Sequence, residues 1–438
     1  MKPVLAISCP ASSRSGYGDH SRDLIRSLIS MDKFDVKVLD QPWGGCPRNA
    51  LHDERDNDIM SRCIGGLEAQ PDVWVQVTVP NEFQAVGKYN IGITAGMETT
   101  AVSAPWIQGC NRMQLVVVPS KHSKVAFETS VFDQNDKNGN RVGELRATTP
   151  IEVLFEGLDL SIFNKVLEKD DLPVTIVKSI DEIPEEFCFL LVGHWLQGQL
   201  HHDRKDIGGV IQTFLHSFKG KASRNQPALI LKTSSATFSV IDREDMLKRI
   251  NTLKAGMGDI NIPNIYLLHG DLTPSEMNGL YNHPKVKSMV SFTHGEGFGR
   301  PLLEFSVTGK PVVASNWSGH VDFLDKYGVG LPGELKNVHE SAVWKDVIIP
   351  ESQWFYVNHG QASTILKDVV KNYKAYLEIS RKQTQYVKDN FTLEQMGNVF
   401  NDILTKYLPV FTHQVELKLP KLPKLTSVKL PKMEKQNV

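Results

Sequence analysis

The sequence has few cysteines, almost no net charge and no long hydrophobic run. Its formal net charge is -1, so no overall positive field draws the protein to nucleic acid or to a membrane. No apolar run approaches bilayer length, and the apolar start of the chain is better explained as a strand than as a signal peptide. The five cysteines are scattered and contain no CxxC pair, which argues for reduced thiols rather than a disulfide framework or a zinc site: Cys9, Cys46, Cys63, Cys110 and Cys188. We expect a cytoplasmic protein with no membrane span.

Short β-branched runs alternate with helical patterns in both halves of the chain, which is typical of βαβ units and parallel sheets. Strands are expected at residues 4–8, 34–39, 73–77, 91–95, 115–119 and 151–155, and again at 187–192, 228–233, 265–268, 287–293 and 311–315. Helices between them include residues 21–29, 121–129, 206–218 and 273–281. Because 438 residues exceed one ordinary core, we predict an α/β protein with two Rossmann-like domains facing across a cleft.

Composition suggests where the domains begin and end. We expect an N-terminal domain at 1–165, a polar acidic linker at 166–186, a second domain at 187–390 and a C-terminal helix at 391–411 that crosses back to the first domain. Residues 133–149 are expected to form an exposed excursion. The tail, 412–438, contains a Lys-Leu-Pro repeat from Lys418 to Leu425 with the period of polyproline II. It is either disordered or docks on a partner.

The strongest motif, THGEGFGRPLLEFSVTGKPVVASN, runs from Thr293 to Asn316 and combines a strand, a glycine-rich turn and a helix. Gly295, Gly297 and Gly299 remove side chains where the backbone must bend and approach a ligand. Pro301 suits the first turn of a helix, whose N-terminus offers free N–H groups to an anion. An ordinary strand, turn and helix with two solvated glutamates is the alternative, but it does not explain why these features occur together.

Glu296 and Glu304 have seven residues between them and can face the same cleft. This pair resembles the E-x7-E motif of a large family of retaining GT-B glycosyltransferases, the glycosyl transferases of group 1, which includes many mannosyl- and glucosyltransferases. The resemblance implies that Glu296 contacts sugar hydroxyls of the donor, with backbone N–H groups from Gly297, Phe298 and Gly299. It implies that Glu304 hydrogen-bonds the ribose of the nucleotide.

Other segments match the same family in the same order. Gly16-Tyr17-Gly18 follows the first expected strand and resembles the glycine loop that covers the donor diphosphate near the acceptor. Gly157-Leu158-Asp159, followed by Phe163, resembles the segment that ends the N-terminal domain. The resemblance therefore makes 1–165 the acceptor-side domain and 187–390 the donor domain.

A basic pair, Arg204-Lys205, follows the strand that ends near Gly193 and resembles the basic residues with which the family binds the donor diphosphate. Two cations suit a leaving diphosphate, on which negative charge grows as the glycosidic bond breaks. Many relatives carry Arg directly after the strand-ending glycine, whereas this chain has His194. We therefore expect Arg204 and Lys205 to bind the donor diphosphate. The alternative is an ordinary solvated pair of basic residues.

The acceptor side is less specific. Glu98 follows an expected strand where relatives place a polar residue near the reaction centre. It either orients the acceptor hydroxyl or forms a surface ion pair. Trp106 is expected to pack a helix, with stacking on a sugar or base as the alternative. Gly319 matches a recurrent family glycine, and His20 and His320 have packing or capping as the alternative to a functional role.

No metal or other cofactor is expected. Asp56-Asn57-Asp58 is formally a D-x-D sequence, but it lies in a charged run rather than after an apolar strand, so we interpret it as an exposed loop or a helix start. The sequence has no HExxH motif and no clustered His/Cys set. The family resemblance also implies no obligatory metal.

Together with these residues, the family resemblance implies a retaining glycosyltransferase that transfers a sugar from a nucleoside-diphosphate sugar, with UDP favoured over GDP, to an acceptor hydroxyl. The diphosphate itself acts as the base in front-face transfer. The sequence of the motif also resembles glycosyltransferases of large tailed bacteriophages. A phage-encoded protein of this kind would be located in the host cytoplasm. One alternative is therefore a DNA glycosyltransferase that adds glucose or arabinose to 5-hydroxymethylcytosine, with Arg14, Lys121 and Lys124 in a local basic patch. A non-catalytic nucleotide or glycan binder is the other.

Overall fold

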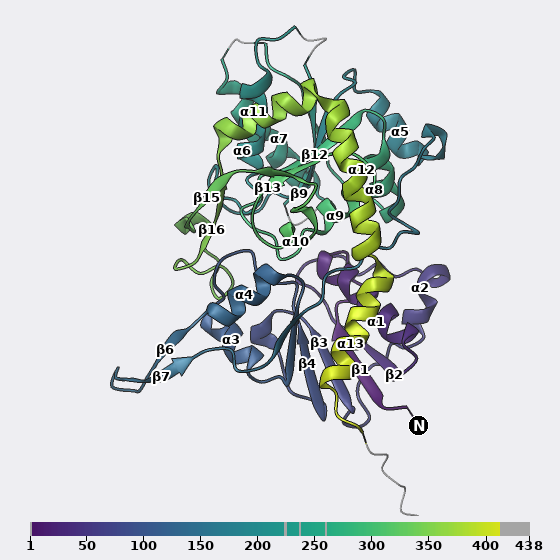
Figure 1. The fold of residues 1–438 in the computed structure, drawn as a ribbon, viewed down its shortest axis with the longest axis vertical. Coiled ribbons are helices and arrows are strands. Elements are labelled where there is room, and N and C mark those ends of the chain that lie inside the picture. Colours follow the sequence, from purple (N-terminus) through teal and green to yellow (C-terminus); the bar gives the residue numbers. More distant parts are fainter. Residues whose placement is uncertain (1, 223–225, 236–237, 259–260, 412–438) are drawn as a thin grey trace, which may run out of the picture. The chain divides into compact units, whose positions relative to one another are not determined.

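Two six-stranded parallel sheets, one in each half of the chain, form the framework of the protein (Figure 1). The computed structural model describes residues 2–222, 226–235, 238–258 and 261–411, and Lys2–Leu408 form one compact unit. The predicted Lys-Leu-Pro tail from Lys418 to Leu425 lies outside the described residues.

The first sheet has the strand order β2-β1-β3-β4-β5-β8 and the second has the order β11-β10-β9-β12-β13-β14. The strands of the first sheet are β1 (Val4–Cys9), β2 (Asp35–Asp40), β3 (Val73–Val77), β4 (Tyr89–Ile93), β5 (Leu115–Val118) and β8 (Ile151–Val153). Those of the second are β9 (Cys188–His194), β10 (Ala228–Ser234), β11 (Ile265–Leu268), β12 (Val286–Ser291), β13 (Val312–Ser315) and β14 (Val329–Leu331). Every expected strand is present, with ends that differ by a few residues.

The helices of the first half are α1 (Gly16–Ser30), α2 (Asp53–Met60), α3 (Ala104–Cys110) and α4 (Lys121–Thr129). Those of the second half are α5 (Val174–Asp181), α6 (Ile207–Phe218), α7 (Val240–Ala255), α8 (Pro274–Asn282), α9 (Arg300–Ser306), α10 (Val321–Leu324), α11 (His359–Lys371), α12 (Tyr373–Asn390) and α13 (Leu393–Tyr407). Short 3-10 turns lie at Pro80–Glu82, Lys169–Asp171 and Glu340–Ala342.

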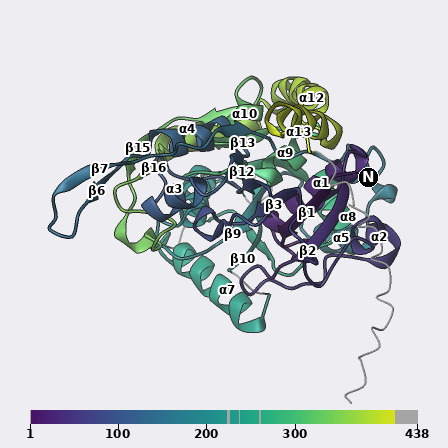
Figure 2. The same cartoon turned by 90° about the horizontal axis from the view of Figure 1, so that it is seen from below.

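The second sheet is apolar on both faces because helices cover both of them (Figure 2). Side chains alternate along each strand, so Phe189 and Leu191 of β9 pack with α6, α7 and α11, whereas Leu190 packs on the opposite side with α5, α8 and α9. This alternation explains why the sequence of β9 is a continuous hydrophobic run rather than a half-polar strand.

Two segments differ from the expected organisation. Residues 166–186, expected as a linker, contain α5, whose Ile176 and Ile180 are buried against the core of the second domain. Their spacing of four places both side chains on one face of a short helix, and the polar flanks hide this signal. The excursion at 133–149 is exposed, as predicted, but it forms an antiparallel hairpin of β6 (Phe132–Asn135) and β7 (Arg141–Leu145) with a shift of register after Gln134, which extends away from the first sheet in Figure 1.

The chain returns to the first domain at its end. α12 packs on the second domain, and α13 then lies along α1 (Figure 1). Leu158 and Thr392 form a β-bridge at the crossing, where the Leu158 N–H donates to the Phe391 carbonyl at 2.9 Å and the Leu393 N–H donates to the Leu158 carbonyl at 2.9 Å. A Cβ on Gly157 would lie 2.7 Å from the Cα of Leu393, which explains the glycine at this position.

A second hairpin, β15 (Gly333–Asn337) with β16 (Gln353–Val357), extends the second domain. All five cysteines are free. Among the described residues, no helix combines the length and the apolar character that a membrane-spanning segment needs.

Candidate active site

A large cleft opens where the carboxyl ends of the two sheets meet. In each sheet the strand order reverses direction beside the first strand of the domain, between β1 and β3 and between β9 and β12. Ligands of open parallel sheets bind at such switch points, outside the carboxyl ends of the strands. The loops after these strands line one cleft of about 1780 Å³, which exceeds a typical single-ligand pocket of about 300 to 1,000 Å³.

An ion cluster from both domains lies in this cleft. Arg204 and Lys205, in the loop between β9 and α6, both pair with Glu296, which follows β12. Arg204 Nη1 lies 3.3 Å from Glu296 Oε2, and Lys205 Nζ donates to Glu296 Oε1. Glu98, in the loop after β4, completes the cluster with Oε1 3.4 Å from Arg204 Nη1. The structure thus brings together the four residues expected to carry the chemistry.

Burial and charge act in opposite directions on this cluster. Burial alone would raise the pKa of Glu296, but Lys205 and Arg204 outweigh it and lower that pKa to about 2. Burial lowers the pKa of Lys205 despite its pairing with Glu296. Burial opposes the charge of Arg204 as well, but Glu98 and Glu296 raise its pKa. The cluster therefore holds two cations in a largely dehydrated place, where an anionic group gains most from them.

Hydrogen bonds from the residues that follow β12 hold the loop that carries the basic pair. The Arg204 carbonyl accepts the His294 N–H at 2.8 Å and the Thr293 hydroxyl at 3.3 Å. A Cβ on Gly193 would lie 3.3 Å from Lys205 Cε, so the glycine leaves room for the lysine stem. His194, which stands where relatives carry an arginine, lines the cleft and lies 3.3 Å from the Ser234 hydroxyl.

Close backbone contacts explain the glycine-rich turn. A Cβ on Gly295 would lie 1.8 Å from the Glu98 carbonyl oxygen, and one on Gly297 would lie 2.0 Å from that of Ala95. These two glycines therefore let the turn pack on the loop after β4, a contact between domains that the ligand-binding interpretation of the glycines did not foresee. Gly299 has φ +97 and forms the N-cap of α9, as expected from Pro301.

Hydrogen bonds within the second domain also hold the glycine-rich turn. The Glu296 N–H donates to the Ser318 hydroxyl at 2.9 Å, and the Gly319 N–H donates to the Glu296 carbonyl at 2.9 Å. His320 lies 2.6 Å from the Ser315 carbonyl through Nε2 and is buried, so it supports this loop rather than facing the cleft. Phe298 is buried against Phe323, although the cleft reaches part of it.

Glu304 lies in a second, more acidic group around Arg300. Arg300 Nη1 lies 2.7 Å from Asp23 Oδ2 and 3.9 Å from Glu156 Oε2, and its Nε lies 3.2 Å from Glu304 Oε1. The Tyr281 hydroxyl donates to Glu304 Oε2 at 3.0 Å. Burial raises the pKa of Glu304 to about 7 and that of Glu156 to about 8, although Arg300 acts against both shifts.

The two glycines of the loop after β1 have different roles. Gly16 lines the cleft, and nothing lies within 4 Å of a Cβ added to it, whereas a Cβ on Gly18 would lie 2.1 Å from the Ser13 carbonyl oxygen. Gly18 is therefore required for packing and does not line the cleft, contrary to its expected place beside the donor. Tyr17 stacks on Trp43 with ring centroids 3.9 Å apart, and its hydroxyl lies 3.0 Å from that of Thr94.

The remaining candidates are buried. Trp106 in α3 stacks on Phe127, as its packing interpretation predicted, and also lines part of the cleft. His20 is buried beside Arg300, and burial lowers its pKa to about 3. Asp56 of the D-x-D sequence is in α2 and fully buried, where it pairs with Arg26 and Arg55, so the prediction of an exposed site was wrong for this residue.

Two cleft residues were missed by the sequence analysis. Lys232 stands in the apolar strand β10, lines the cleft and donates to the Gly270 carbonyl at 2.7 Å. A lone lysine in an otherwise apolar strand was the available signal. Arg300 was considered only as a helix start, and its partners Asp23 and Glu156 are too distant in sequence for any spacing rule to connect them.

Comparison with known proteins identifies the fold. No protein-family description and no curated protein sequence matches this chain. Sucrose-phosphate synthase from Thermosynechococcus elongatus is similar in structure with a TM-score of 0.60 and 11% identity, over 93% of this chain and 99% of that one. Anabaena HepE in complex with UDP and glucose gives 0.55 and 12%, over 92% and 100%. A glycosyltransferase from Rickettsia africae gives 0.55 and 14%, over 93% and 99%.

At these identities the similarity establishes architecture. The chain has the GT-B fold, with two Rossmann-like α/β domains and a C-terminal helix that returns to the first of them, as the sequence predicted.

Proposed function

We propose that the protein is a glycosyltransferase that transfers a sugar from a nucleoside-diphosphate sugar to an acceptor hydroxyl with retention of configuration. The proposal rests on one observation. Buried Glu296 pairs with Arg204 and Lys205 in the cleft, where the switch points of the two sheets face each other. The similarity to proteins described as glycosyltransferases adds support. A non-catalytic binder would need neither the dehydrated cations nor the second carboxylate on Arg204.

Glu296 has a double role in this proposal. Without donor it holds Arg204 and Lys205 in place, which limits the reorganisation needed when a diphosphate arrives. The diphosphate then takes over the two cations, and Glu296 accepts hydrogen bonds from sugar hydroxyls. While Glu296 pairs with the two cations its pKa is lowered to about 2, so it is ionised when the donor arrives.

The position of Glu98 supports front-face transfer. A carboxylate that served as general base would face the acceptor apart from the leaving group. Glu98 instead lies 3.4 Å from Arg204, the cation that we assign to the diphosphate. In the proposed step the acceptor oxygen bonds to the anomeric carbon on the face that the diphosphate leaves, and the departing diphosphate oxygen takes the acceptor proton. Glu98 orients the acceptor.

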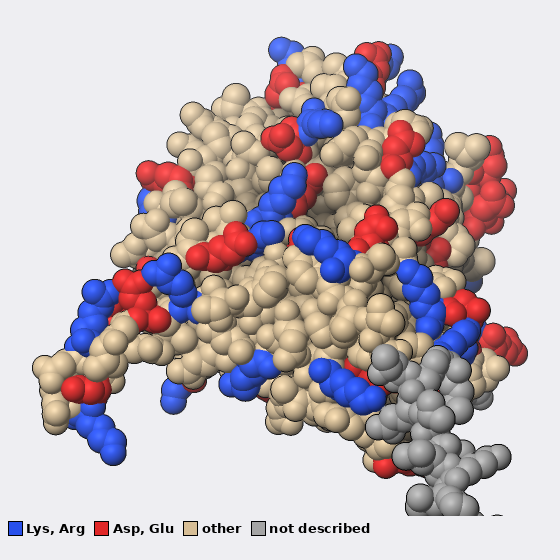
Figure 3. Space-filling model, turned by 60° about the horizontal axis from the view of Figure 1, so that its bottom comes forward, with Lys and Arg blue, Asp and Glu red and all other residues tan. Residues whose placement is uncertain are grey.

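The donor nucleotide is proposed to be UDP, because HepE binds UDP and glucose in a fold of the same kind. Arg204 and Lys205 supply the positive charge for the diphosphate, and the proposed reaction therefore requires no Mg²⁺ or Mn²⁺. No observation among the described residues favours DNA as the acceptor. Arg14 pairs with Asp271 and Lys124 with Glu128, and on the face shown in Figure 3 basic and acidic side chains are interspersed. We therefore propose a sugar hydroxyl as the acceptor.

The test is a set of reactions with α-linked UDP-sugars and a panel of acceptors, analysed by NMR of the product. We expect an α-linked product, formed equally well in EDTA and with added Mg²⁺. Lys205→Ala should lower kcat by about 100- to 1,000-fold, the usual effect of removing one charge-stabilising donor. Glu98→Gln should lower it less. A β-linked product would contradict retention and make Glu98 the candidate base, and calorimetry without detectable binding of any nucleoside diphosphate would contradict the transferase itself.

A further inference from the structure

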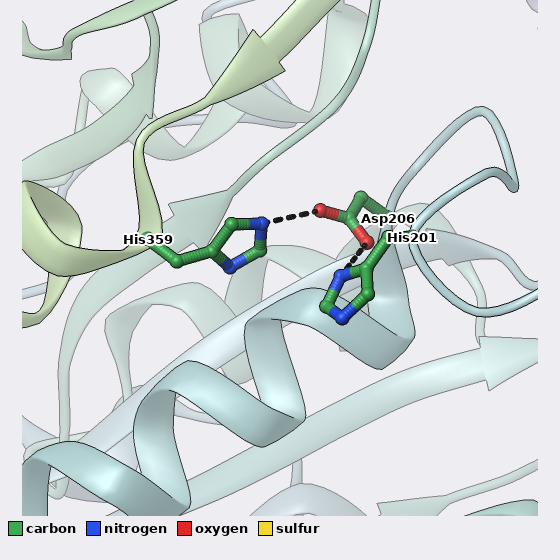
Figure 4. A group of neighbouring side chains, drawn as sticks. All are labelled: His201, Asp206 and His359. Carbon is green, nitrogen blue, oxygen red and sulfur yellow. Dashed lines mark ion pairs between the residues drawn. The ribbon is translucent and has the colours of Figure 1, made fainter.

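A second cluster of polar side chains includes Asp206, the residue that follows the basic pair in the sequence. His201 and Asp206 flank Arg204-Lys205 in the loop before α6, and His359 is the first residue of α11. Figure 4 shows the two imidazole rings on either side of the Asp206 carboxylate. One ligand atom from each of the three residues lies within 4.8 Å of the others.

The distances in this cluster are too long for good hydrogen bonds. His201 Nδ1 lies 3.4 Å from Asp206 Oδ1, and His359 Nε2 lies 3.5 Å from Asp206 Oδ2. Ligands about 2.0 to 2.1 Å from a tetrahedral zinc ion are separated by about 3.3 Å. The two imidazoles approach different oxygens of the Asp206 carboxylate, so binding requires the carboxylate to turn one oxygen toward both rings and the two imidazole nitrogens to come closer together.

The outer nitrogen of each ring is held by another side chain. His201 Nε2 lies 2.8 Å from Gln212 Oε1, and His359 Nδ1 lies 2.7 Å from the Thr213 hydroxyl. The amide oxygen of Gln212 can only accept, so His201 carries its proton on Nε2 when neutral and presents a lone pair at Nδ1. Metal-binding histidines show this arrangement, in which a second hydrogen bond fixes the ring orientation. The Thr213 hydroxyl can donate or accept, so it orients the His359 ring and leaves Nε2 free to present a lone pair.

Two further observations point to a missing partner at this place. His201 Nδ1 is buried and has no hydrogen-bond partner. The Asp206 side chain is only 1% exposed and, as the N-cap of α6, accepts the Gly209 N–H at 3.0 Å through Oδ1. In addition, His201 and Asp206 have φ of +68 and +44, a region that costs free energy for residues other than glycine and is retained mainly where function needs it.

We propose that His201 Nδ1, the Asp206 carboxylate and His359 Nε2 bind one Zn²⁺ ion, with water as the fourth ligand. Two imidazoles and one carboxylate form a donor set that suits zinc and does not suit Mg²⁺ or Ca²⁺. The His201 and His359 side chains are 32% and 36% exposed, so solvent reaches the place from outside. The ion connects the loop that carries Arg204 and Lys205 to the start of α11. Its role is to fix that loop, and it takes no part in the transfer step.

The test uses the full chain without a histidine tag, stripped with a chelator and titrated with ZnCl₂ in a calorimeter. We expect one zinc ion per chain and a rise in Tm of about 3 to 6 °C at saturation, the size that tight binding of one ion gives in a domain of this class. His359→Ala should abolish both effects. Gln212→Ala, which keeps all three ligands, should weaken binding by about 10- to 100-fold. His216→Ala, on the exposed face of α6, is the matched control and should bind like the wild type.

A wild-type chain that binds no zinc, or a His359→Ala variant that binds it as well as the control, would overturn the proposal. Should His359→Ala fail to fold, Co²⁺ in the wild-type chain gives an independent measurement. The intense visible absorption of tetrahedral Co²⁺ is expected, and an octahedral spectrum would exclude the proposed coordination. Both readouts are independent of the proposed glycosyl transfer, so failure of one proposal leaves the other intact.

Discussion

At the scale of single residues, the two glutamates of the E-x7-E pair lie in opposite electrostatic surroundings. Glu296 faces two cations and has its pKa lowered to about 2, although burial acts against this. Glu304 is buried, shares Arg300 with two other carboxylates and has its pKa raised to about 7. Carboxyl groups whose surroundings separate their pKa values usually have separate tasks. Glu304 is therefore the one whose charge changes near neutral pH.

This difference predicts pH-dependent nucleotide binding. If Glu304 accepts hydrogen bonds from the ribose, only its ionised form binds well, and the ionised fraction rises about tenfold between pH 6 and pH 8 for a pKa near 7. The Kd for UDP should fall by up to about tenfold over this range. Glu304→Gln should bind weakly and lose this part of the pH dependence, while ionisation of the diphosphate affects both proteins alike. Isothermal titration calorimetry at several pH values is the measurement, and identical pH profiles for the two proteins would refute the ribose assignment.

At the scale of elements, the positions of the loops depend on glycines more than on side-chain contacts. The turn from Gly295 to Gly299 and the loop after β4 approach until backbone meets backbone, because neither Gly295 nor Gly297 has a Cβ. This approach brings Glu98 to Arg204.

Gly297→Ala should therefore separate the two loops. Its Cβ would lie 2.0 Å from the Ala95 carbonyl oxygen, a backbone atom that cannot move alone. We expect a loss of stability of about 1 to 3 kcal/mol, the usual cost of overpacking, together with a fall in kcat that exceeds the change in KM. Gly66→Ala is the control, since nothing lies within 4 Å of the Cβ that it would add. Thermal unfolding and steady-state kinetics measure both effects, and a Gly297→Ala enzyme equal to the control would show that the loops tolerate separation.

The elements could be predicted from sequence where the signal is local. Apolar runs such as that of β9 identify strands, and Pro301 after Gly299 marks the start of α9. The packing of Gly297 on Ala95 and the partners of Arg300 depend on chain segments far apart in sequence, and no local pattern encodes them. The histidine cluster shows the same limit, because His359 is remote from Asp206 and joins it only through the packing of α11 on α6.

At the scale of the whole molecule, Arg300 joins the two halves of the chain. It belongs to α9 of the second domain and pairs with Asp23 of α1 at 2.7 Å. Asp23, Glu156 and Glu304 all have raised pKa values because they are buried, and Arg300 is the cation that offsets their charge.

Arg300→Ala should leave these carboxylates buried without a cation and lower the free energy of unfolding by about 3 to 5 kcal/mol. Since their pKa values in the folded protein lie above the unfolded values, with Glu304 at about 7 and Glu156 at about 8, protonation relieves the repulsion at low pH. The loss should therefore be larger at pH 8 than at pH 6. Urea unfolding at both pH values tests this, with Arg243→Ala on the exposed surface of α7 as the control. An equal loss at both pH values would indicate that packing, and not charge, is what Arg300 contributes.

The chain passes between its two domains twice, and the two passages are joined by hydrogen bonds between Leu158 and the pair Phe391 and Leu393. This bridge of two hydrogen bonds resists sliding of one passage along the other. We therefore expect any change in the opening of the cleft to be mainly a rotation near the bridge, which would return Glu98 to the same arginine. The alignment of the two domains then depends on a contact that lies outside the cleft.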